Sequence, residues 1–462
     1  MNINKPITSA LLALGLISAA SMAYADSTVS IGGQSYAQVF ITGSTAARGN
    51  VFNAVNTAHA SGGVFDSVPT YVTAGLGAAP TGSTSAYTAY GTIGGTRYCL
   101  CLDFTGSEAG LWALEHTTTG AGIPNPVAAN TLHGNTASPN AVIPGTPEPT
   151  GFIDPNSGNA LTANADLAMA DTSQAVSLSA PPTFAALHDY GIVGAVTFEW
   201  VKGKNSSPDG SWNHLANITD PEANILLGST PQVADYFTGN VADQDDVYVV
   251  GRNKASGTHQ NTMLDTLHGT TTGVNQWVVN SATYNGSGVL TVGTVESISS
   301  AGGISTVGND GFDSGGNVAS TLECDAAGYT DTFGFPVVMV GYLGISDANT
   351  AIGGGAAALT LNGVAENDET VENGTYSYWG HEHLYGTVSE DSAVQAIAQS
   401  LAGTTAIESF GSGTPTGALQ AAGGLGGGEA NPGSTQSSII SPEFMAADKP
   451  SGGDAGYASQ IP

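Results

Sequence analysis

The sequence is short of positive charge. Only 8 of its 462 residues are Lys or Arg, against 38 Asp or Glu, so the formal net charge is −30. Phosphate backbones and anionic lipid surfaces repel such a chain, which excludes nucleic acids and charged membranes as partners held by bulk electrostatics. Charged residues are only 10% of the chain and glycines number 64, so the surface is polar and rich in small residues rather than densely acidic.

Cysteine is scarce as well. Cys99, Cys101 and Cys324 are the only three, and they lack the spacing of a zinc or redox motif. Cys99 and Cys101 fall two residues apart on one face of a predicted strand. In an exported protein one of them could pair with Cys324 and leave a free thiol, but the apolar context favours small buried side chains.

After the N-terminal segment, no apolar run is long enough for a transmembrane helix. Residues 1–25 contain Lys5, an apolar stretch from Ile7 to Ala20 and an A-x-A sequence that ends at Ala25, which is the pattern of a secretory signal peptide. The apolar stretch is short and broken by Ser and Gly, which argues against a membrane anchor. No Cys follows the cleavage point to carry a lipid, so we expect a periplasmic or secreted protein.

Strand-like and helix-like segments alternate along the rest of the chain. Apolar residues 36–43 precede a Gly-Ser-Thr turn and a helical pattern, residues 87–103 read as a hairpin around Gly94-Gly95, and residues 389–402 read as a helix that stops at Gly403. This alternation predicts an α/β fold with mainly parallel sheets. Residues 117–159 and the Gly-rich stretch 417–436 lack periodicity, so we expect a surface insertion and a flexible linker there.

The arginines are the most informative residues. There are only three, Arg48, Arg97 and Arg252, and each lies on or near a strand, Gly/Ser/Thr turn and helix start. The first N–H groups of a helix lack intrahelical partners and carry partial positive charge, and a guanidinium adds planar donors. Such loops predict an anion site if they converge, although each Ser or Thr taken alone could simply cap its own helix.

These loops resemble those of the phosphate-binding substrate proteins of phosphate-specific ABC transporters, which are type II periplasmic binding proteins. The family has a G-S-T loop, a Gly-Ser turn, a D-[IF]-[AG]-x-[SA]-D segment and an R-x-x-x-S-G-T element. The matching residues here are Gly43–Thr45, Gly106-Ser107, Asp166–Asp171, and Arg252 with Ser256, Gly257 and Thr258. Weaker matches follow in the family's order, so the resemblance covers most of residues 36–402.

The resemblance implies a ligand-binding set of Ser44, Thr45, Ser107, Asp171, Arg252, Ser256, Gly257 and Thr258. Hydroxyls and backbone amides would donate to phosphate, and Asp171 would orient Arg252 and accept the proton of the bound ligand. Sulfate at neutral pH has no proton to give, so that carboxylate would discriminate against it. No cofactor, metal or catalytic residue is implied. The inserted segment, the scarcity of Lys, and Ala46 and Ala47 after Thr45 depart from the family pattern.

The implied architecture has two lobes with the ligand in the cleft between them. Lobe one would comprise residues 36–188 and 346–462, and lobe two residues 189–345, with hinge segments in the apolar runs near 191–201 and 337–344. The partners would be inorganic phosphate and an ABC-transporter permease, and we expect a monomer.

Two other functions are compatible with the sequence. A secreted structural protein that reuses the fold would explain the Gly-rich, low-charge composition and would self-associate. A phosphatase-like enzyme would need a nucleophile or a metal, and neither is evident. His381 and His383 in the HEH sequence could form half of a metal site, but no third ligand is near in the sequence. Glu108 is a weaker alternative to Asp171 as proton acceptor.

Overall fold

The computed structural model describes residues 27–119, 151–174, 187–204, 210–280, 294–297, 307–323, 331–386, 391–422, 439–449 and 459–461, apart from positions 162, 164, 230, 271, 309, 310, 313, 332 and 413–415. The strands are β1 (Thr28–Ile31), β2 (Gln34–Gly43), β3 (Thr70–Val72), β4 (Ala86–Ile93), β5 (Thr96–Asp103), β6 (Phe152–Ile153), β7 (Ala160–Leu161), β8 (Leu167–Ala170), β9 (His188–Lys202), β10 (Asn217–Ile218), β11 (Gln232–Val233), β12 (Asp246–Val250), β13 (Trp277–Asn280), β14 (Thr294–Ser297), β15 (Val307–Gly308), β16 (Gly311–Phe312), β17 (Val337–Gly344), β18 (Ala357–Ala358), β19 (Thr360–Leu361), β20 (Trp379–Gly386), β21 (Ile439–Ile440), β22 (Ala447–Asp448) and β23 (Ser459–Gln460). The helices are α1 (Arg48–Asn56), α2 (Ser107–Thr119), α3 (Ser211–His214), α4 (Asp220–Gly228), α5 (Asp235–Thr238), α6 (Gly257–Asp265), α7 (Gly315–Glu323), α8 (Ile345–Gly353), α9 (Asp368–Glu372), α10 (Ser392–Ala402) and α11 (Ala418–Ala422), with short 3-10 turns at His59–Ser61 and Ala74–Leu76.

Most of the long strands belong to one sheet. Its strand order is β11-β12-β17-β9-β20-β8-β2-β5-β4-β3, and β1, β18 and β21 attach to this path to give 13 strands. β2 is parallel to β5 and β8, and β12 is parallel to β17, whereas β9 and β20 are antiparallel to their neighbours. The α/β class is confirmed. The expectation of a separate, mainly parallel sheet in each lobe is corrected, because 13 of the described strands form one continuous sheet with both parallel and antiparallel pairs, and the other described strands form two-stranded sheets.

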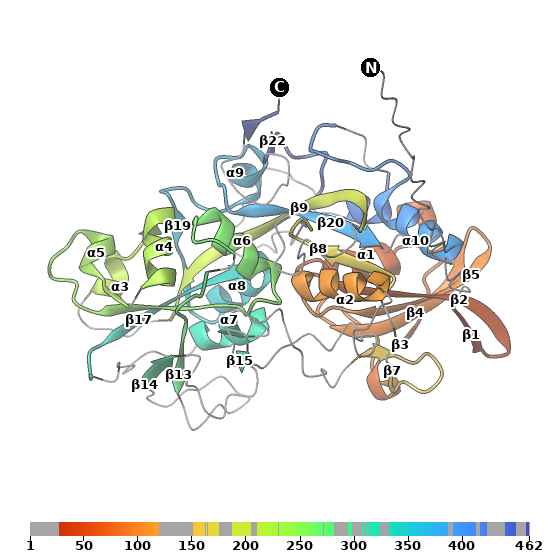
Figure 1. Ribbon diagram of the computed structural model, residues 1–462, viewed down its shortest axis with the longest axis horizontal. Coiled ribbons are helices and arrows are strands. Elements are labelled where there is room, and N and C mark those ends of the chain that lie inside the picture. Colours follow the sequence, from red (N-terminus) through yellow and green to blue (C-terminus); the bar gives the residue numbers. More distant parts are fainter. Residues whose placement is uncertain are drawn as a thin grey trace, which may run out of the picture.

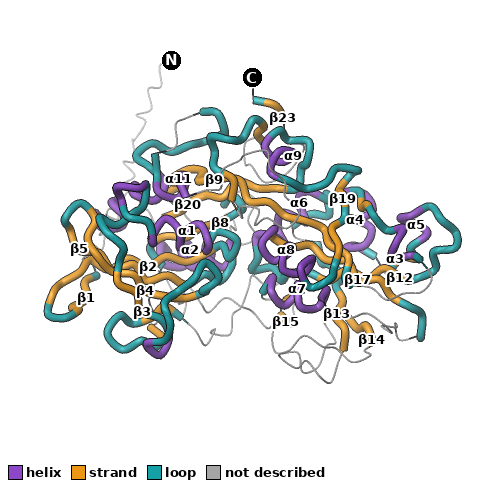
Figure 2. Tube along the Cα trace, turned by 180° about the vertical axis from the view of Figure 1, so that it is seen from behind, coloured by secondary structure: helices purple, strands orange, loops and turns teal. Residues whose placement is uncertain are grey.

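The length of β9 explains this continuity. It has 15 residues, and a strand of this length spans about 50 Å. Residues His188–Thr197 pair with β20, and residues Phe198–Lys202 pair with β17. Figure 1 shows α3 to α8 gathered around one end of this strand and α1, α2 and α10 around the other, and Figure 2 shows the same division from behind. We call the part with β1–β5 and β8 the first half and the part with β11, β12 and β17 the second half.

Aromatic packing holds the join between the halves. The Trp200 ring on β9 lies 5.5 Å from the Tyr342 ring on β17 and 6.5 Å from the Tyr378 ring, measured between centroids. All three side chains are almost completely buried and belong to a core cluster that also contains residues of β2, β5 and β12. Large buried rings contribute strongly to stability, so this cluster fixes β9 against both neighbours.

Two local predictions are confirmed in detail. Ile93 and Thr96 are paired across β4 and β5, so Gly94-Gly95 forms the two-residue turn, with positive φ at both glycines. Helix α10 begins after Asp391, whose carboxylate accepts the N–H groups of Ala393 and Val394 and so caps the helix.

The segment expected to be a surface insertion is partly buried. Residues 120–150 lie outside the described residues. At the C-terminal end of the segment, β6 pairs with β7, and the Phe152 ring packs 5.0 Å from the Phe40 ring. Phe152 and Ile153 are buried, so the prediction of a surface position is wrong for them.

The segment expected to be a flexible linker, residues 417–436, begins with helix α11, in which Leu419 is fully buried. Residues 423–438 lie outside the described residues.

Cys99 and Cys101 are free thiols within the core, which confirms the prediction of small buried side chains. Cys324 and the expected signal peptide lie outside the described residues. Among the described helices, none combines the length and apolarity needed to cross a bilayer.

Candidate functional site

Three loops of the first half meet because three parallel strands end side by side. β8, β2 and β5 are neighbours that run in one direction, so their carboxyl ends share an edge of the sheet. The Ser44 N–H donates to the Met169 carbonyl (2.7 Å), and the Gly106 N–H donates to the Gly43 carbonyl (2.8 Å). The loops that begin α1 and α2 are therefore fixed beside Asp171, which directly follows β8.

The second half supplies two more loops of this kind, from the parallel strands β12 and β17. After β12 the chain passes through Arg252 and enters α6 at Gly257, and after β17 it enters α8 at once, at Ile345. The Arg252 carbonyl accepts hydrogen bonds from Gln276 Nε2 (3.1 Å) and from the Tyr342 hydroxyl (3.2 Å). These bonds fix the backbone from which the guanidinium extends.

Strand β16 supports the same loop through backbone contacts. The Asn253 N–H donates to the Phe312 carbonyl (2.8 Å), and the Phe312 N–H donates to the Gly251 carbonyl (2.9 Å). A Cβ on Gly311 would lie only 2.2 Å from the Arg252 carbonyl oxygen, so the two segments pack backbone to backbone. The position of Arg252 is thus set by tertiary contacts and not by the loop alone.

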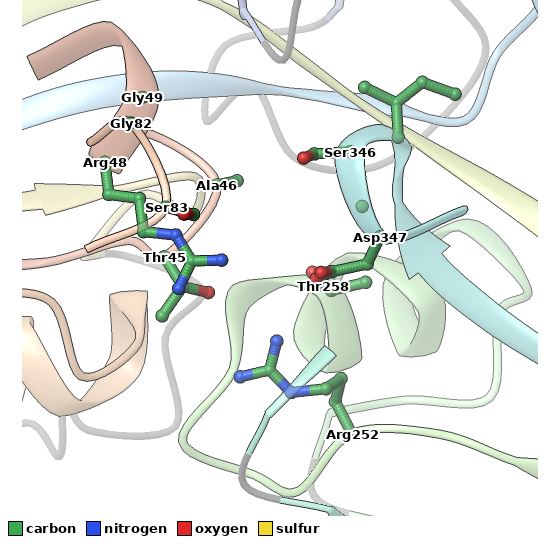
Figure 3. A pocket seen from close by; sticks show the side chains of 12 residues that line it. Thr45, Ala46, Arg48, Gly49, Gly82, Ser83, Arg252, Thr258, Ser346 and Asp347 are labelled. Atoms are coloured by element: carbon green, nitrogen blue, oxygen red, sulfur yellow. The ribbon is translucent and has the colours of Figure 1, made fainter. Parts of the chain in front are cut away.

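A cavity of about 250 Å³ lies where the loops of the two halves face each other. It is lined by Thr45, Ala46, Arg48, Gly49, Gly82, Ser83, Arg252, Thr258, Gly344, Ile345, Ser346 and Asp347. Figure 3 shows the side chains of Arg48 and Arg252 reaching toward this space from the two halves. The N-terminal ends of α1, α6 and α8 all contribute to the wall, so three sets of N–H groups without intrahelical partners border one cavity.

The charges of the wall favour an anion. Two guanidinium groups face one carboxyl group, that of Asp347, and the three helix ends add partial positive charge. Burial raises the pKa of Asp347, while the nearby guanidinium groups of Arg252 and Arg48 act in the opposite direction. A chain of net charge −30 therefore concentrates two of its three arginines on a single cavity.

The predicted ligand residues divide into two groups. Thr45, Arg252 and Thr258 line the cavity. The others lie in the same loops but are buried and do not line it: Ser44, Ser107, Asp171, Ser256 and Gly257. The structure thus brings the predicted loops together, with some of their side chains at the cavity and some packed against each other.

Ser107, Asp171 and Gly257 form a direct contact between the halves. The Asp171 N–H donates to Ser107 Oγ (3.3 Å). A Cβ on Gly257 would lie 1.3 Å from Asp171 Oδ1 and 2.7 Å from Ser107 Oγ, so only glycine fits. Gly106 is constrained too, because its φ is +123° and a Cβ there would lie 2.4 Å from the Ala255 carbonyl oxygen. These approaches give a physical reason for glycine in both motifs.

Sequence reasoning missed Ser83, Ser346 and Asp347 and left Arg48 out of the ligand set. Ser346 and Asp347 lie in the first turn of α8, directly after β17. This is the same succession of buried strand and helix start that identified the other loops, so the signal was available in the sequence. No such pattern marks Ser83, because its loop does not lead from a strand into a helix. Only the tertiary fold brings this loop to the cavity.

Arg97 does not reach the site. It is exposed on β5 opposite Thr92, close to the hairpin turn. It lies six positions before Asp103 at the carboxyl end of the strand, which corresponds to about 20 Å. Arg97, which was not among the predicted ligand residues, therefore lies on the strand that leads to a convergent loop but not in the loop itself.

The residues set aside as metal ligands or as a second proton acceptor have other partners. His381 Nε2 lies 2.8 Å from Asp448 Oδ1, and His383 Nδ1 lies 3.0 Å from Asp189 Oδ2. Glu108 accepts a hydrogen bond from the Thr172 hydroxyl (2.7 Å). Within the described parts of the chain, no group of three or more His, Cys, Asp or Glu side chains is arranged to hold a metal ion.

Comparison with known proteins gives structural likenesses only. No family model and no curated protein sequence matches the chain. The fold is similar to a structure described as a phosphate ABC transporter substrate-binding protein with bound phosphate from Clostridium perfringens (12% identity, TM-score 0.39, covering 78% of this chain and 91% of that one). It is also similar to PstS from Borrelia burgdorferi (12% identity, TM-score 0.33, covering 79% of this chain and 92% of that one). A third similar structure is an ABC-type phosphate transport receptor from Vibrio cholerae (15% identity, TM-score 0.29, covering 51% of this chain and 74% of that one). These proteins belong to the family that the loop motifs resemble.

Proposed function

We propose that the protein binds a tetrahedral oxyanion, inorganic phosphate, in the cavity between the two halves. One observation carries the proposal: the guanidinium groups of Arg48 and Arg252 and the N-terminal ends of three helices converge on one cavity. Helix N-termini and bidentate guanidinium groups are the donors that proteins use for phosphate groups. No chemistry on the ligand is proposed.

The net charge of −30 is compatible with this role. Affinity depends on short, desolvated hydrogen bonds inside the cavity, whereas the field of the whole protein acts mainly on the rate of encounter. The side chains of Arg252 and Thr258 are nearly buried, so their bonds to a ligand would be little screened by solvent.

A carboxyl group at the site would discriminate between oxyanions. The loop resemblance gives this role to Asp171, and Asp347 is the carboxyl that lines the cavity. A protonated phosphate can donate its O–H to such a group, whereas sulfate would face it without a proton to share. We assign phosphate selectivity to these two carboxyl groups together.

In this proposal the protein is an extracytoplasmic solute-binding protein. It would act as a monomer with two lobes near the expected bounds (residues 36–188 plus 346–462, and residues 189–345), except that α8 packs with α7 and β17 in the core of the second half and so belongs to lobe two. It would close on phosphate by a hinge motion and deliver it to an ABC-transporter permease. The cavity supports this scheme because its wall combines residues from both halves, so that ligand binding would favour the closed arrangement.

Calorimetric titration of phosphate-stripped protein at neutral pH tests the proposal. We expect a Kd for phosphate of about 1 μM or tighter, which corresponds to about −8 kcal/mol, and no heat with sulfate. The Asp347→Asn and Asp171→Asn variants should bind sulfate measurably, because each lacks one of the opposing carboxylates. Absence of heat for both anions with the unmodified protein would contradict the proposal and favour the alternative of a secreted structural protein.

A further inference from the structure

Glu382 is a buried acidic residue directly behind the proposed site. It lies in the middle of β20, is fully buried, and neither carboxyl oxygen is in hydrogen-bonding geometry with another described residue. Its neighbours His381 and His383 belong to the opposite face of the strand, where each is bonded to a carboxylate. Glu382 is therefore separated from both histidines and their partners.

The groups that face Glu382 come from two of the loops described above. The Ser44 hydroxyl lies near it from the loop after β2, and the Asp171 carboxyl acts on it from the end of β8. In the antiparallel register of β20 and β8, His383 pairs with Ala170, so Glu382 and Asp171 are the next residues on the two strands. On its other side β20 faces Gly194 of β9, which carries no side chain. No Lys or Arg acts on Glu382 within the described part of the chain.

Each of these two contacts is one residue away from the cavity wall. Ser44 precedes Thr45, which lines the cavity. Asp171 Oδ1 lies against Gly257, which precedes the lining residue Thr258. A negative charge on Glu382 would thus stand beside Asp171 and behind loops of both halves, where the low dielectric screens it little.

We propose that Glu382 is a positioning residue whose carboxyl group is protonated when the oxyanion is bound. Binding of the oxyanion in the cavity is then accompanied by uptake of a proton by Glu382. A neutral Glu382 leaves the back of the site with one carboxylate instead of two. The Ser44 hydroxyl suits both states, because it can donate to an ionised carboxylate or accept from a protonated one. The proton comes from solvent, and no bond of the oxyanion is broken. This inference rests on the proposed oxyanion binding.

The direction of the effect follows from electrostatics. Burial, and secondly the charge of Asp171, raise the pKa of Glu382 well above its usual value, and the Ser44 hydroxyl lowers it. A bound oxyanion raises the pKa further because like charges disfavour ionisation. Between the pKa of the free protein and that of the complex, binding takes up a proton, so affinity falls as pH rises through this window.

Calorimetry of phosphate binding in buffers of different ionisation enthalpy, from pH 6 to 9.5, counts the protons taken up. Phosphate itself exchanges protons, so the quantity of interest is the difference between the unmodified protein and Glu382→Gln at each pH. Where free Glu382 is half ionised, we expect a difference of about half a proton per phosphate and a contribution to the change in Kd of about threefold per pH unit. Glu382→Gln should lack both, while it still binds phosphate.

Glu199→Gln is the matched control. Glu199 is also buried, and burial alone raises its pKa to about 7, whereas Glu382 is also acted on by Asp171 and Ser44 of the site loops. Its replacement should leave the proton count unchanged. Glu382→Met provides a second uncharged side chain of similar length if the glutamine variant folds poorly.

Phosphate binding with equal proton counts in the unmodified protein and both Glu382 variants at every pH would overturn this inference and leave the proposed function intact. Failure of the unmodified protein to bind phosphate would overturn both.

Discussion

Replacement of Arg252 by alanine is expected to weaken phosphate binding by about 30-fold to several thousandfold. Removing one partner of a buried, hydrogen-bonded charge pair costs about 2–5 kcal/mol, and Arg252 is 2% exposed at the cavity wall. Arg252→Lys should lose an intermediate amount, because an ammonium keeps the charge but not the bidentate geometry. Titration calorimetry of the three proteins measures these differences.

The chain offers a matched control for this experiment. Arg97→Ala removes the same side chain and the same charge from an exposed position on β5, away from the cavity. We expect its Kd to stay within about twofold of the unmodified protein, because exposed charges act weakly through solvent. Equal losses in Arg97→Ala and Arg252→Ala would mean that net charge, and not a built site, determines binding.

Gly257→Ala is expected to be the most damaging small substitution at the site. Its Cβ would fall 1.3 Å from Asp171 Oδ1 and 2.4 Å from the carboxyl carbon, so the whole side chain would have to move. Asp171 is buried, and its carbonyl accepts a hydrogen bond from Asn261 Nδ2 (2.8 Å), which restricts that movement. We expect a loss of about 1–3 kcal/mol in the free energy of unfolding and at least 100-fold weaker phosphate binding.

Two comparisons make this prediction specific. Gly273→Ala adds the same methyl group where nothing lies within 4 Å, so stability should be unchanged or slightly higher. In the Asp171→Ala background, Gly257→Ala should cost much less stability, because the clashing carboxyl group is gone. Additive losses in the double variant, measured by denaturant unfolding, would show that Gly257 is needed for another reason.

The sequence predicts the loops of the site better than it predicts their side-chain roles. Gly43–Thr45, Gly106-Ser107 and Arg252–Thr258 each follow a buried strand and precede a helix, and parallel neighbours bring such ends to one edge. Local pattern therefore identifies which segments converge. It does not reveal that Ser44 turns toward Glu382 while Thr45 faces the cavity, because that choice depends on contacts across the sheet.

The failures of prediction have similar causes. The joined sheet depends on β9 pairing with two different strands, and a single apolar run carries no information about how many partners it has. Glu382 was considered only as part of the two-histidine pattern. Its proximity to Asp171 results from the pairing of β20 with β8, two strands that are far apart in the sequence. Phe152 was assigned to the surface because the residues around it lack periodicity, although it packs on Phe40.

A crystal structure of the protein saturated with phosphate tests the central claim most directly. The account predicts one tetrahedral ligand in the cavity, with oxygens about 2.7–3.2 Å from the guanidinium nitrogens of Arg252 and Arg48 and from donors at the start of α6 or α8. An empty cavity at saturating phosphate, or phosphate bound elsewhere with neither arginine in contact, would contradict it.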